Sequence, residues 1–256
     1  MTAQAETAVY IYGILPGDVA FEEQPTGVGT PPSPVRLVHY RDIAALVSDV
    51  DVSNPLGTPD DLLIHEELLD TSATAVPVLP LRFGAVVTNE DVVTDEFLKP
   101  YYDEFNEALQ ELEGYQEYIV RGRYDQKAIL REILAEDPQA AALSEQIRGA
   151  DPDASREGQI QLGQLISERL TDKRALDTQR LGDTLADLVS MSAVRPPGDD
   201  LEAVHAAFLV KTTEADQVVS AAQELAADWE GRIDLRVIGP VAAYDFVATT
   251  GPSPGG

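Results

Sequence analysis

The residue types best suited to chemistry are few in this sequence, and none stands at the spacing that a familiar site requires. The 256-residue chain has no cysteine and three histidines, which excludes disulfides, thiolate zinc sites and cysteine nucleophiles. His65 precedes Glu66 as in a zinc-protease helix, but Leu69 stands where the second histidine would be. We therefore expect His65 to border the apolar face of a helix. His39 and His205 are expected at the surface or hydrogen-bonded in the core.

Glycine-rich and acidic stretches give equally little indication of a ligand. Gly27-Val-Gly-Thr-Pro-Pro32 begins like a dinucleotide-binding fingerprint, but Pro32 replaces the third glycine and no helix is expected to follow. Acidic pairs are expected by chance in a chain with 45 Asp and Glu residues. General acid–base work needs two carboxyl groups in different environments, which a sequence does not show. We predict no catalytic residue, no cofactor and no metal ligand.

Net charge is the unusual property of this chain. The 18 Lys and Arg residues against 45 Asp and Glu residues give −27 at pH 7. Such a surface is repelled by phosphate backbones and anionic lipid, so we expect neither nucleic acid nor a membrane as partner. The first residues lack the basic start of a signal peptide, and no stretch approaches the roughly 20 apolar residues of a membrane span. We expect a cytoplasmic protein.

The first part of the chain predicts mixed strands and helices. Thr58 is a helix cap, with Pro59 at the first helical position and two acids in the first turn. The stretch from Val76 to Gly84 contains two prolines, which cannot donate to a ladder, so it predicts an edge or bulged strand. Together with β-branched runs and apolar spacing, these signals predict strands at residues 9–14, 35–39, 43–50 and 76–84, and helices at 58–75 and 89–113 with a break at Pro100.

The second part predicts strands alternating with helices. We expect strands at residues 115–123, 204–211 and 233–238, helices at 125–135, 140–148, 156–191 and 215–229, and a short extended piece at 244–247. This order predicts an α+β protein of two domains, the second a modified ferredoxin-like unit with a long helical insertion. We place the domains at residues 1–113 and 114–248, with a flexible tail at 249–256.

Two aromatic segments are the remaining candidates for contact with a partner. Tyr10 and Tyr12 lie on one side of the first predicted strand. Leu81-Arg82-Phe83-Gly84 follows the proline-broken strand. An edge strand beside exposed aromatic side chains would let another polypeptide dock by main-chain pairing. The same residues also suit an ordinary core and turn, and the sequence leaves both interpretations open.

Taken together, segments spread over nearly the whole chain resemble the gas vesicle protein F/L family (GvpF/GvpL). The most specific piece is the Leu-Pro-Leu-Arg-Phe-Gly string that ends at Gly84, after a helix containing His65. The sequence departs from the family at Val241-Ala242-Ala243, where a Trp-Pro-Pro-like stretch is common. This departure weakens a contact role for that loop. The residues carrying the resemblance, which are also the candidate contact residues, are Tyr10, Tyr12, Gly13, His65, Pro80, Leu81, Arg82, Phe83, Gly84, Gly239, Pro240, Tyr244 and Phe246.

The resemblance implies an accessory protein of gas vesicles, with two α+β domains and no enzymatic activity. Members are thought to bind the small hydrophobic shell protein and other accessory gas vesicle proteins, as chaperone, nucleator or minor shell component. A strongly anionic partner would keep an apolar shell subunit dispersed. The alternative from another class is a small-ligand-binding domain or enzyme, because ferredoxin-like units host many functions.

Overall fold

The structure is a computed structural model that describes residues 7–21, 23–148 and 152–247, with the side chains of 152–155 left out. Its residues form two compact units. The first unit holds the chain up to Glu117 and again from Gly239, and the second holds Tyr118–Ile238. Our sequence-based boundaries differ from this division, because they assign the stretch from Gly239 to residue 248 to the second domain. The predicted tail at 249–256 lies outside the described residues.

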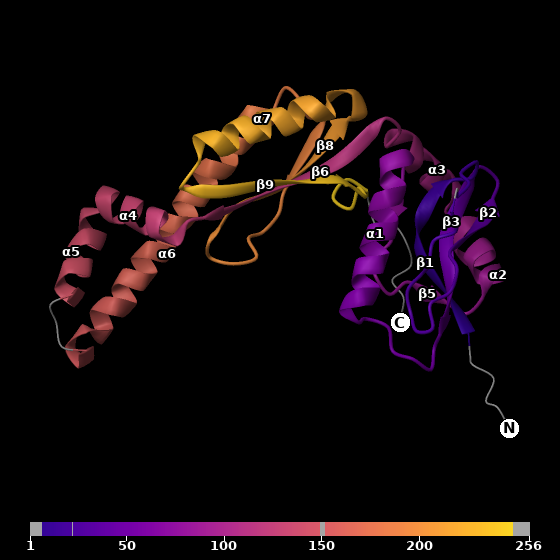
Figure 1. Ribbon diagram of the computed structural model, residues 1–256, viewed down its shortest axis with the longest axis horizontal. Helices are drawn as coiled ribbons and strands as arrows, with labels where there is room; N and C mark the ends of the chain where they lie inside the picture. Colours follow the sequence, from indigo (N-terminus) through magenta and orange to yellow (C-terminus); the bar gives the residue numbers. More distant parts are fainter. Residues whose placement is uncertain (1–6, 22, 149–151, 248–256) are drawn as a thin grey trace. The chain divides into compact units, whose positions relative to one another are not determined.

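The first unit contains a five-stranded antiparallel sheet in the order β2-β3-β1-β4, with β5 also paired to β1. One core cluster of this unit lies between this sheet and one helix, where the tyrosines of the first strand meet Leu68 and Leu69. Figure 1 shows α1 running beside β1. The elements are β1 (Thr7–Pro16), β2 (Arg36–Tyr40), β3 (Ile43–Asp51), α1 (Pro59–Ala75), β4 (Leu79–Pro80), β5 (Val86–Val87), α2 (Glu90–Val92), a π-helical turn (Val93–Leu98) and α3 (Tyr102–Glu111).

Local sequence signals placed most of these elements correctly. The Thr58 side chain accepts a hydrogen bond from the Asp61 N–H at 3.2 Å, and the Asp61 carboxylate accepts one from the Thr58 N–H at 3.0 Å. This reciprocal capping confirms the predicted start of α1. The predicted strand at 76–84 was wrong in length, since only Leu79–Pro80 pairs with β1. Its predicted edge position is confirmed.

The second unit contains a four-stranded sheet in the order β7-β8-β6-β9. Numbered along the chain, this is the fourth-first-third-second order of a β-α-β-β-α-β ferredoxin-like unit. The sheet's core face packs against α6 and α7 through residues such as Leu181 and Val218. The predicted α+β class is confirmed. The elements are β6 (Tyr115–Tyr124), α4 (Gln126–Glu136), α5 (Pro138–Arg148), α6 (Pro152–Leu185), β7 (Met191–Val194), β8 (Glu202–Lys211), a 3₁₀ turn (Thr212–Glu214), α7 (Ala215–Asp228) and β9 (Ile233–Val241).

Two predicted elements in this part of the chain were wrong. The long helix does not reach residue 191 but ends at Leu185, and Met191–Val194 forms the edge strand β7 against β8. Its four residues become a strand because β8 offers them a partner, which is information absent from the local pattern. The stretch at 244–247 is a turn rather than an extended piece, and the Tyr244 N–H donates to the Ala242 carbonyl at 2.8 Å.

Candidate functional site

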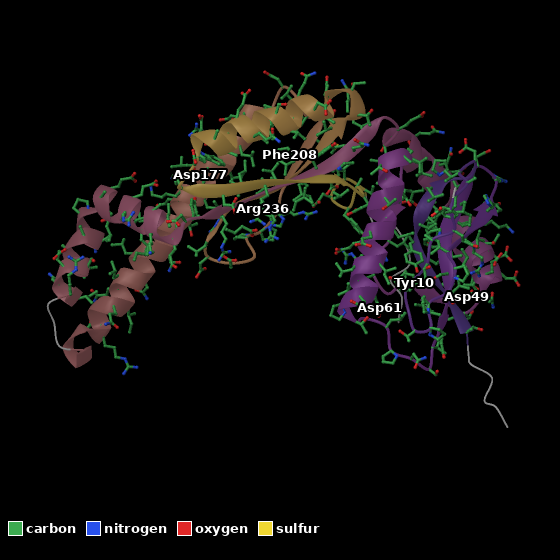
Figure 2. The ribbon with its side chains drawn as sticks, in the orientation of Figure 1. Tyr10, Asp49, Asp61, Asp177, Phe208 and Arg236 are labelled. Carbon is green, nitrogen blue, oxygen red and sulfur yellow. The ribbon has the colours of Figure 1, made fainter. Side chains whose placement is uncertain are left out.

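A buried aromatic and polar cluster in the first unit gathers several of the residues singled out by the sequence. At its centre, the side chain of His65 on α1 is 2% exposed. Its Nδ1 lies 3.0 Å from the Tyr10 hydroxyl, and its Nε2 lies 3.2 Å from the Leu81 carbonyl and 3.1 Å from the Tyr244 hydroxyl. One imidazole therefore joins α1 to β1, to the chain after β4 and to the C-terminal part of the first unit. Figure 2 labels Tyr10 within this unit.

The hydrogen-bond directions in this cluster follow from its carbonyl group. Because the Leu81 carbonyl can only accept, Nε2 of His65 carries the hydrogen and Nδ1 accepts from the Tyr10 hydroxyl. The Tyr10 oxygen in turn accepts from the Gly84 N–H at 3.0 Å. Burial lowers the pKa of His65 to about 4, against a smaller opposing effect of the Leu81 carbonyl. The imidazole is therefore neutral at pH 7.

The glycine-rich segment before β2 supports this cluster with its backbone. The Val28 N–H donates to the Tyr12 hydroxyl at 2.8 Å, and that hydroxyl lies 2.8 Å from Ser48 Oγ. A Cβ at Gly27 would collide with the Tyr12 hydroxyl and with Ser48. This glycine is therefore needed for a close approach of chain to side chain. The segment that began like a dinucleotide fingerprint instead caps a core tyrosine.

Asp61 ties the same glycine-rich segment to the start of α1. Its carboxylate accepts hydrogen bonds from the N–H groups of Gly29 at 2.9 Å and Gly57 at 3.1 Å, besides those from Thr58. Burial opposes ionisation of Asp61, but the hydrogen bonds from Gly29, Thr58 and Gly57 outweigh it and hold its pKa below the usual value. The sequence indicated Asp61 only as a helix-start acid, so its contact with Gly29 was missed.

Of the two interpretations that the sequence left open for Tyr10 and Tyr12, the structure shows the core position. Tyr10 and Tyr12 are both 0% exposed, with their rings 4.7 Å apart in the core. They are buried because both faces of β1 are covered, which alternation along one strand does not reveal. Gly13 is also buried, and a Cβ there would lie 2.8 Å from the Leu79 carbonyl opposite it. Gly13 thus permits the close pairing of β1 with Leu79 and Pro80.

The segment after β4 divides between core and surface. The Leu81 carbonyl and the Gly84 N–H bind the cluster, and the Phe83 ring lies 5.5 Å from that of His65. Arg82 is exposed. Gly84 has φ +95°, a conformation that favours glycine. Of the residues in this segment, Arg82 is therefore the one whose side chain is exposed to solvent.

The C-terminal residues that carried the resemblance also lie in the first unit. The Ala242 N–H donates to Asp70 Oδ1 at 2.9 Å, and the Asp245 N–H donates to Glu117 Oε2 at 3.2 Å. Gly239 is exposed, whereas Pro240 and Phe246 are half-buried. Sequence reasoning missed Asp70 and Glu117. Neither belongs to a motif, and only their distant partners distinguish them from the many surface acids.

The second unit contains a different polar cluster, built on charges. Arg232, at the start of β9, donates to Glu132 at 2.7 Å and to both oxygens of Asp177 at 2.9 Å. Tyr124 donates to Asp177 at 2.6 Å, and Lys173 donates to Glu132. Burial opposes the charge of Arg232, but the hydrogen bonds that it donates to Glu132 and Asp177 and the negative charge of these acids outweigh burial and raise its pKa. The cluster joins α4, α6, β6 and β9.

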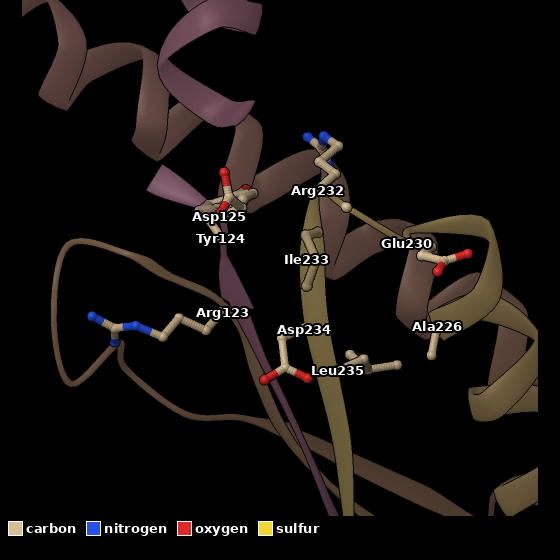
Figure 3. Close-up of a pocket in the computed structure, with 10 residues that line it drawn as sticks. Arg123, Tyr124, Asp125, Ala226, Glu230, Arg232, Ile233, Asp234 and Leu235 are labelled. Carbon is tan, nitrogen blue, oxygen red and sulfur yellow. The ribbon is translucent and has the colours of Figure 1, made fainter. Parts of the chain in front are cut away.

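A cavity of about 480 Å³ lies next to this cluster, at the turn between α7 and β9. Figure 3 shows its lining residues, which include Arg123, Asp125, Glu230 and Arg232. Two of these polar groups are already engaged: Asp125 caps α4 by accepting from the Ala128 N–H, and Arg232 forms ion pairs with Glu132 and Asp177. Within the described residues, no cluster of three or more His, Asp or Glu side chains is arranged to hold a metal ion. No helix among them is long and apolar enough to cross a membrane.

Comparison with known proteins covers almost the whole chain. The family model described as "Gas vesicle synthesis protein GvpL/GvpF" matches residues 8–248. A gas vesicle protein F of a Streptomyces species is 30% identical over 242 residues, covering 94% of this chain and 99% of the relative. The gas vesicle protein F of Dolichospermum flosaquae is 24% identical over 240 residues, covering 93% and 96%.

Solved structures agree with these sequence matches. The crystal structure of GvpF from an Anabaena species superposes with a TM-score of 0.77 at 26% identity, covering 94% of this chain and 98% of the other. The crystal structure of GvpF from Microcystis aeruginosa gives a TM-score of 0.75 at 23% identity, covering 93% and 98%. The fold of the chain is therefore shared with these proteins over both units.

Proposed function

The chain belongs to the gas vesicle synthesis protein GvpL/GvpF family, and from this premise we propose that it is an accessory protein of gas vesicle assembly that binds the small hydrophobic shell protein. The observation that carries the proposal is the family match over residues 8–248. The family is not a known enzyme family, and its name gives a gas-vesicle-related role. The shell-protein partner, other accessory gas vesicle proteins and the mode of action are the proposed part.

The physical properties of the chain support a covering role. A shell subunit with a large apolar surface aggregates unless that surface is shielded. A partner with net charge −27 keeps the resulting complex dispersed by repulsion. We place the contact on the first unit, where Arg82 is exposed and where Leu62 and Leu63 of α1 are 43% and 53% exposed. Because Tyr10 and Tyr12 are buried, we expect them to stabilise the core of this unit and not to contact the shell protein.

The test is co-purification of the shell protein with purified variants of the full chain. We expect Leu62→Ser/Leu63→Ser and Arg82→Ala/Phe83→Ala to reduce the amount of shell protein recovered. Leu176→Ser is the matched control, because Leu176 is 65% exposed on α6 of the second unit. Circular dichroism melts of each variant show whether it is folded, which matters for Phe83 because its ring packs against His65.

The outcomes test the proposed contact surface and the proposed partner separately. Folded variants that recover the shell protein as well as the unmodified chain remove this surface from the proposal. An unmodified chain that recovers none contradicts the proposed partner. Fractionation of floated vesicles then distinguishes the two modes of action: a chaperone stays in the soluble extract, and a resident shell component floats with the vesicles.

A further inference from the structure

The edge strands of the two sheets differ in how they are protected against pairing with other chains. A strand at a sheet edge exposes unpaired main-chain groups, and proteins ordinarily protect such an edge with charges, prolines or very short length. In the first sheet, β2 carries Arg36, and β4 has only two residues, one of them Pro80. In the second sheet, β9 carries Asp234 and Arg236, whose side chains are 67% and 75% exposed. These edges therefore carry the usual protection.

Strand β7, at the other edge of the second sheet, lacks this protection. Its sequence, Met191-Ser-Ala-Val194, contains no charged residue and no proline. Met191 and Val194 are 54% and 68% exposed, and because side chains alternate along a strand they lie on opposite faces of the sheet. Arg195 and Pro196 follow directly, so the unprotected stretch is limited to these four residues. The edge therefore offers an apolar side chain on each face of the sheet.

The main-chain groups of β7 that point away from the sheet belong to Ser192 and Val194. The Arg195 N–H, directly after the strand, donates to the His205 carbonyl of β8 at 2.8 Å. Residues that bond the neighbouring strand alternate along an antiparallel pair, so the N–H and C=O groups of Ser192 and Val194 point away from β8. Both residues are exposed. The edge therefore presents main-chain donors and acceptors at the spacing that a further strand requires.

We propose that β7 is a docking edge for an uncharged, apolar β-strand of another protein, which adds to the second sheet beside β7. Main-chain pairing supplies affinity, and Met191 and Val194 contact apolar side chains of the added strand on both faces. A second copy of this chain is a less suitable occupant, because two chains of net charge −27 repel each other. This inference concerns the second unit and goes beyond the proposed function, whose contact lies on the first unit.

The experiment measures binding of a strand-forming probe to the unmodified full chain by fluorescence anisotropy. The probe is a short labelled peptide of alternating valine and threonine, with N-methyl groups along one edge so that only its other edge can pair. The control peptide carries N-methyl groups along both edges. We expect saturable binding of the probe and at least about tenfold weaker binding of the control peptide. An unmodified chain that does not bind the probe overturns the proposal.

Substitutions of Val194 test the edge itself. Val194→Pro removes an outward N–H but no hydrogen bond between β7 and β8, a position at which edge strands tolerate proline. It should bind the probe at least about tenfold more weakly. Val194→Lys keeps the N–H but adds the kind of charge that protects other edges, and should weaken binding about threefold or more. Val194→Thr, the matched control, keeps the N–H and a β-branched side chain and should bind within about twofold of the unmodified chain.

Circular dichroism melts show which of these variants are folded, and Val194→Lys decides if Val194→Pro is not. A folded Val194→Pro or Val194→Lys chain that binds the probe as tightly as the unmodified chain overturns the proposal. Sedimentation velocity tests the other occupant, and we expect Val194→Pro to leave the oligomeric state unchanged. A dimer that the unmodified chain forms and Val194→Pro does not would make a second copy the occupant and would overturn the assignment to another protein.

Discussion

Each unit of this protein contains a cluster of buried or half-buried polar side chains. The two clusters differ in how these side chains are satisfied. In the first unit, His65 is neutral and is satisfied by tyrosine hydroxyls and main-chain groups. In the second unit, Arg232 and Lys173 are charged and are compensated by Glu132 and Asp177. The neutral cluster depends on hydrogen-bond direction and protonation state, whereas the charged cluster depends on the balance of charge.

The largest effect is expected from breaking the charged cluster. Arg232→Met leaves Glu132 and Asp177 without their main cation. Removing one partner of a fully buried pair costs about 3–5 kcal/mol of unfolding free energy, and because the Arg232 and Glu132 side chains are 26% and 25% exposed, we expect a loss at or somewhat below the lower end of that range. The control is Arg236→Met, because Arg236 and its partner Asp234 are 75% and 67% exposed and such pairs contribute about 0–1 kcal/mol. Urea denaturation at pH 7 measures both. Equal losses in the two variants would contradict the assignment of the Arg232 cluster as a half-buried charged cluster that stabilises the unit.

The neutral state of His65 predicts that the folded chain loses stability in acid. Burial lowers the pKa of His65 from 6.5 to about 4, so as the pH falls from 6.5 the unfolded chain takes up a proton that the folded chain resists. The contribution of His65 to stability therefore falls between pH 6.5 and 4, by about 3 kcal/mol in total, and does not change further below that range. His65→Gln should lack this part of the slope. The measurement is urea denaturation of both chains at several pH values.

Asp70 provides a second test, because its pKa is shifted in the opposite direction from that of His65. Burial raises the pKa of Asp70 in the folded chain. The contribution of Asp70 to stability is therefore present in acid and is lost as the pH rises through its folded-state pKa. Asp70→Asn should therefore make the acid loss due to His65 steeper, while His65→Gln makes it shallower. Identical pH slopes in the two variants would refute the proton assignments.

A smaller effect is expected from removing one hydroxyl of the neutral cluster. Tyr10→Phe leaves the Gly84 N–H and Nδ1 of His65 without their partner, and a buried group left unsatisfied costs about 1–3 kcal/mol. Tyr102→Phe is the control, because its hydroxyl donates to Asp42 in an exposed position. We expect that control to lie within about 0.5 kcal/mol of the unmodified chain. Thermal melting of both variants gives the comparison.

The smallest effect tests a feature visible in the sequence. Thr58→Ala removes the side-chain acceptor for the Asp61 N–H at the start of α1 and should cost about 1 kcal/mol. Thr58→Ser keeps the hydroxyl and serves as control. A Thr58→Ser variant as unstable as Thr58→Ala would show that the cap hydroxyl is not what stabilises this helix end.

Local signals predicted those parts of the fold whose structure depends on near neighbours. The start of α1 and the strand beginning at Tyr115 follow from capping and from alternation with β-branched and aromatic residues. Strand β7 did not follow, because Met191 continues the apolar spacing of the preceding helix and forms a strand only opposite Leu209. The α+β class of the second unit was therefore predicted correctly, but strand β7 was missing from the predicted sheet.

For Tyr10 and Tyr12 the sequence left a surface and a core position both open, and the structure places them in the core. The contact role of the candidate residues stays a prediction. The sequence placed Tyr10, His65, Leu81 and Tyr244 in the family-like segments, and the structure brings these four together. Alternation along a strand shows which side chains share a side, but it does not show whether that side meets solvent. The rings of Tyr10 and Tyr12 proved to be core.

Composition and order along the chain were enough to establish the net charge of −27, the lack of cysteine and the resemblance to a gas vesicle family. These properties are sums over residues or strings of neighbours, and no folding is needed to read them. The burial of Tyr10, the compensation of Arg232 and the return of Tyr244 to His65 were decided only in three dimensions. Each joins residues far apart in sequence, and its energy depends on exclusion of water by the surrounding core.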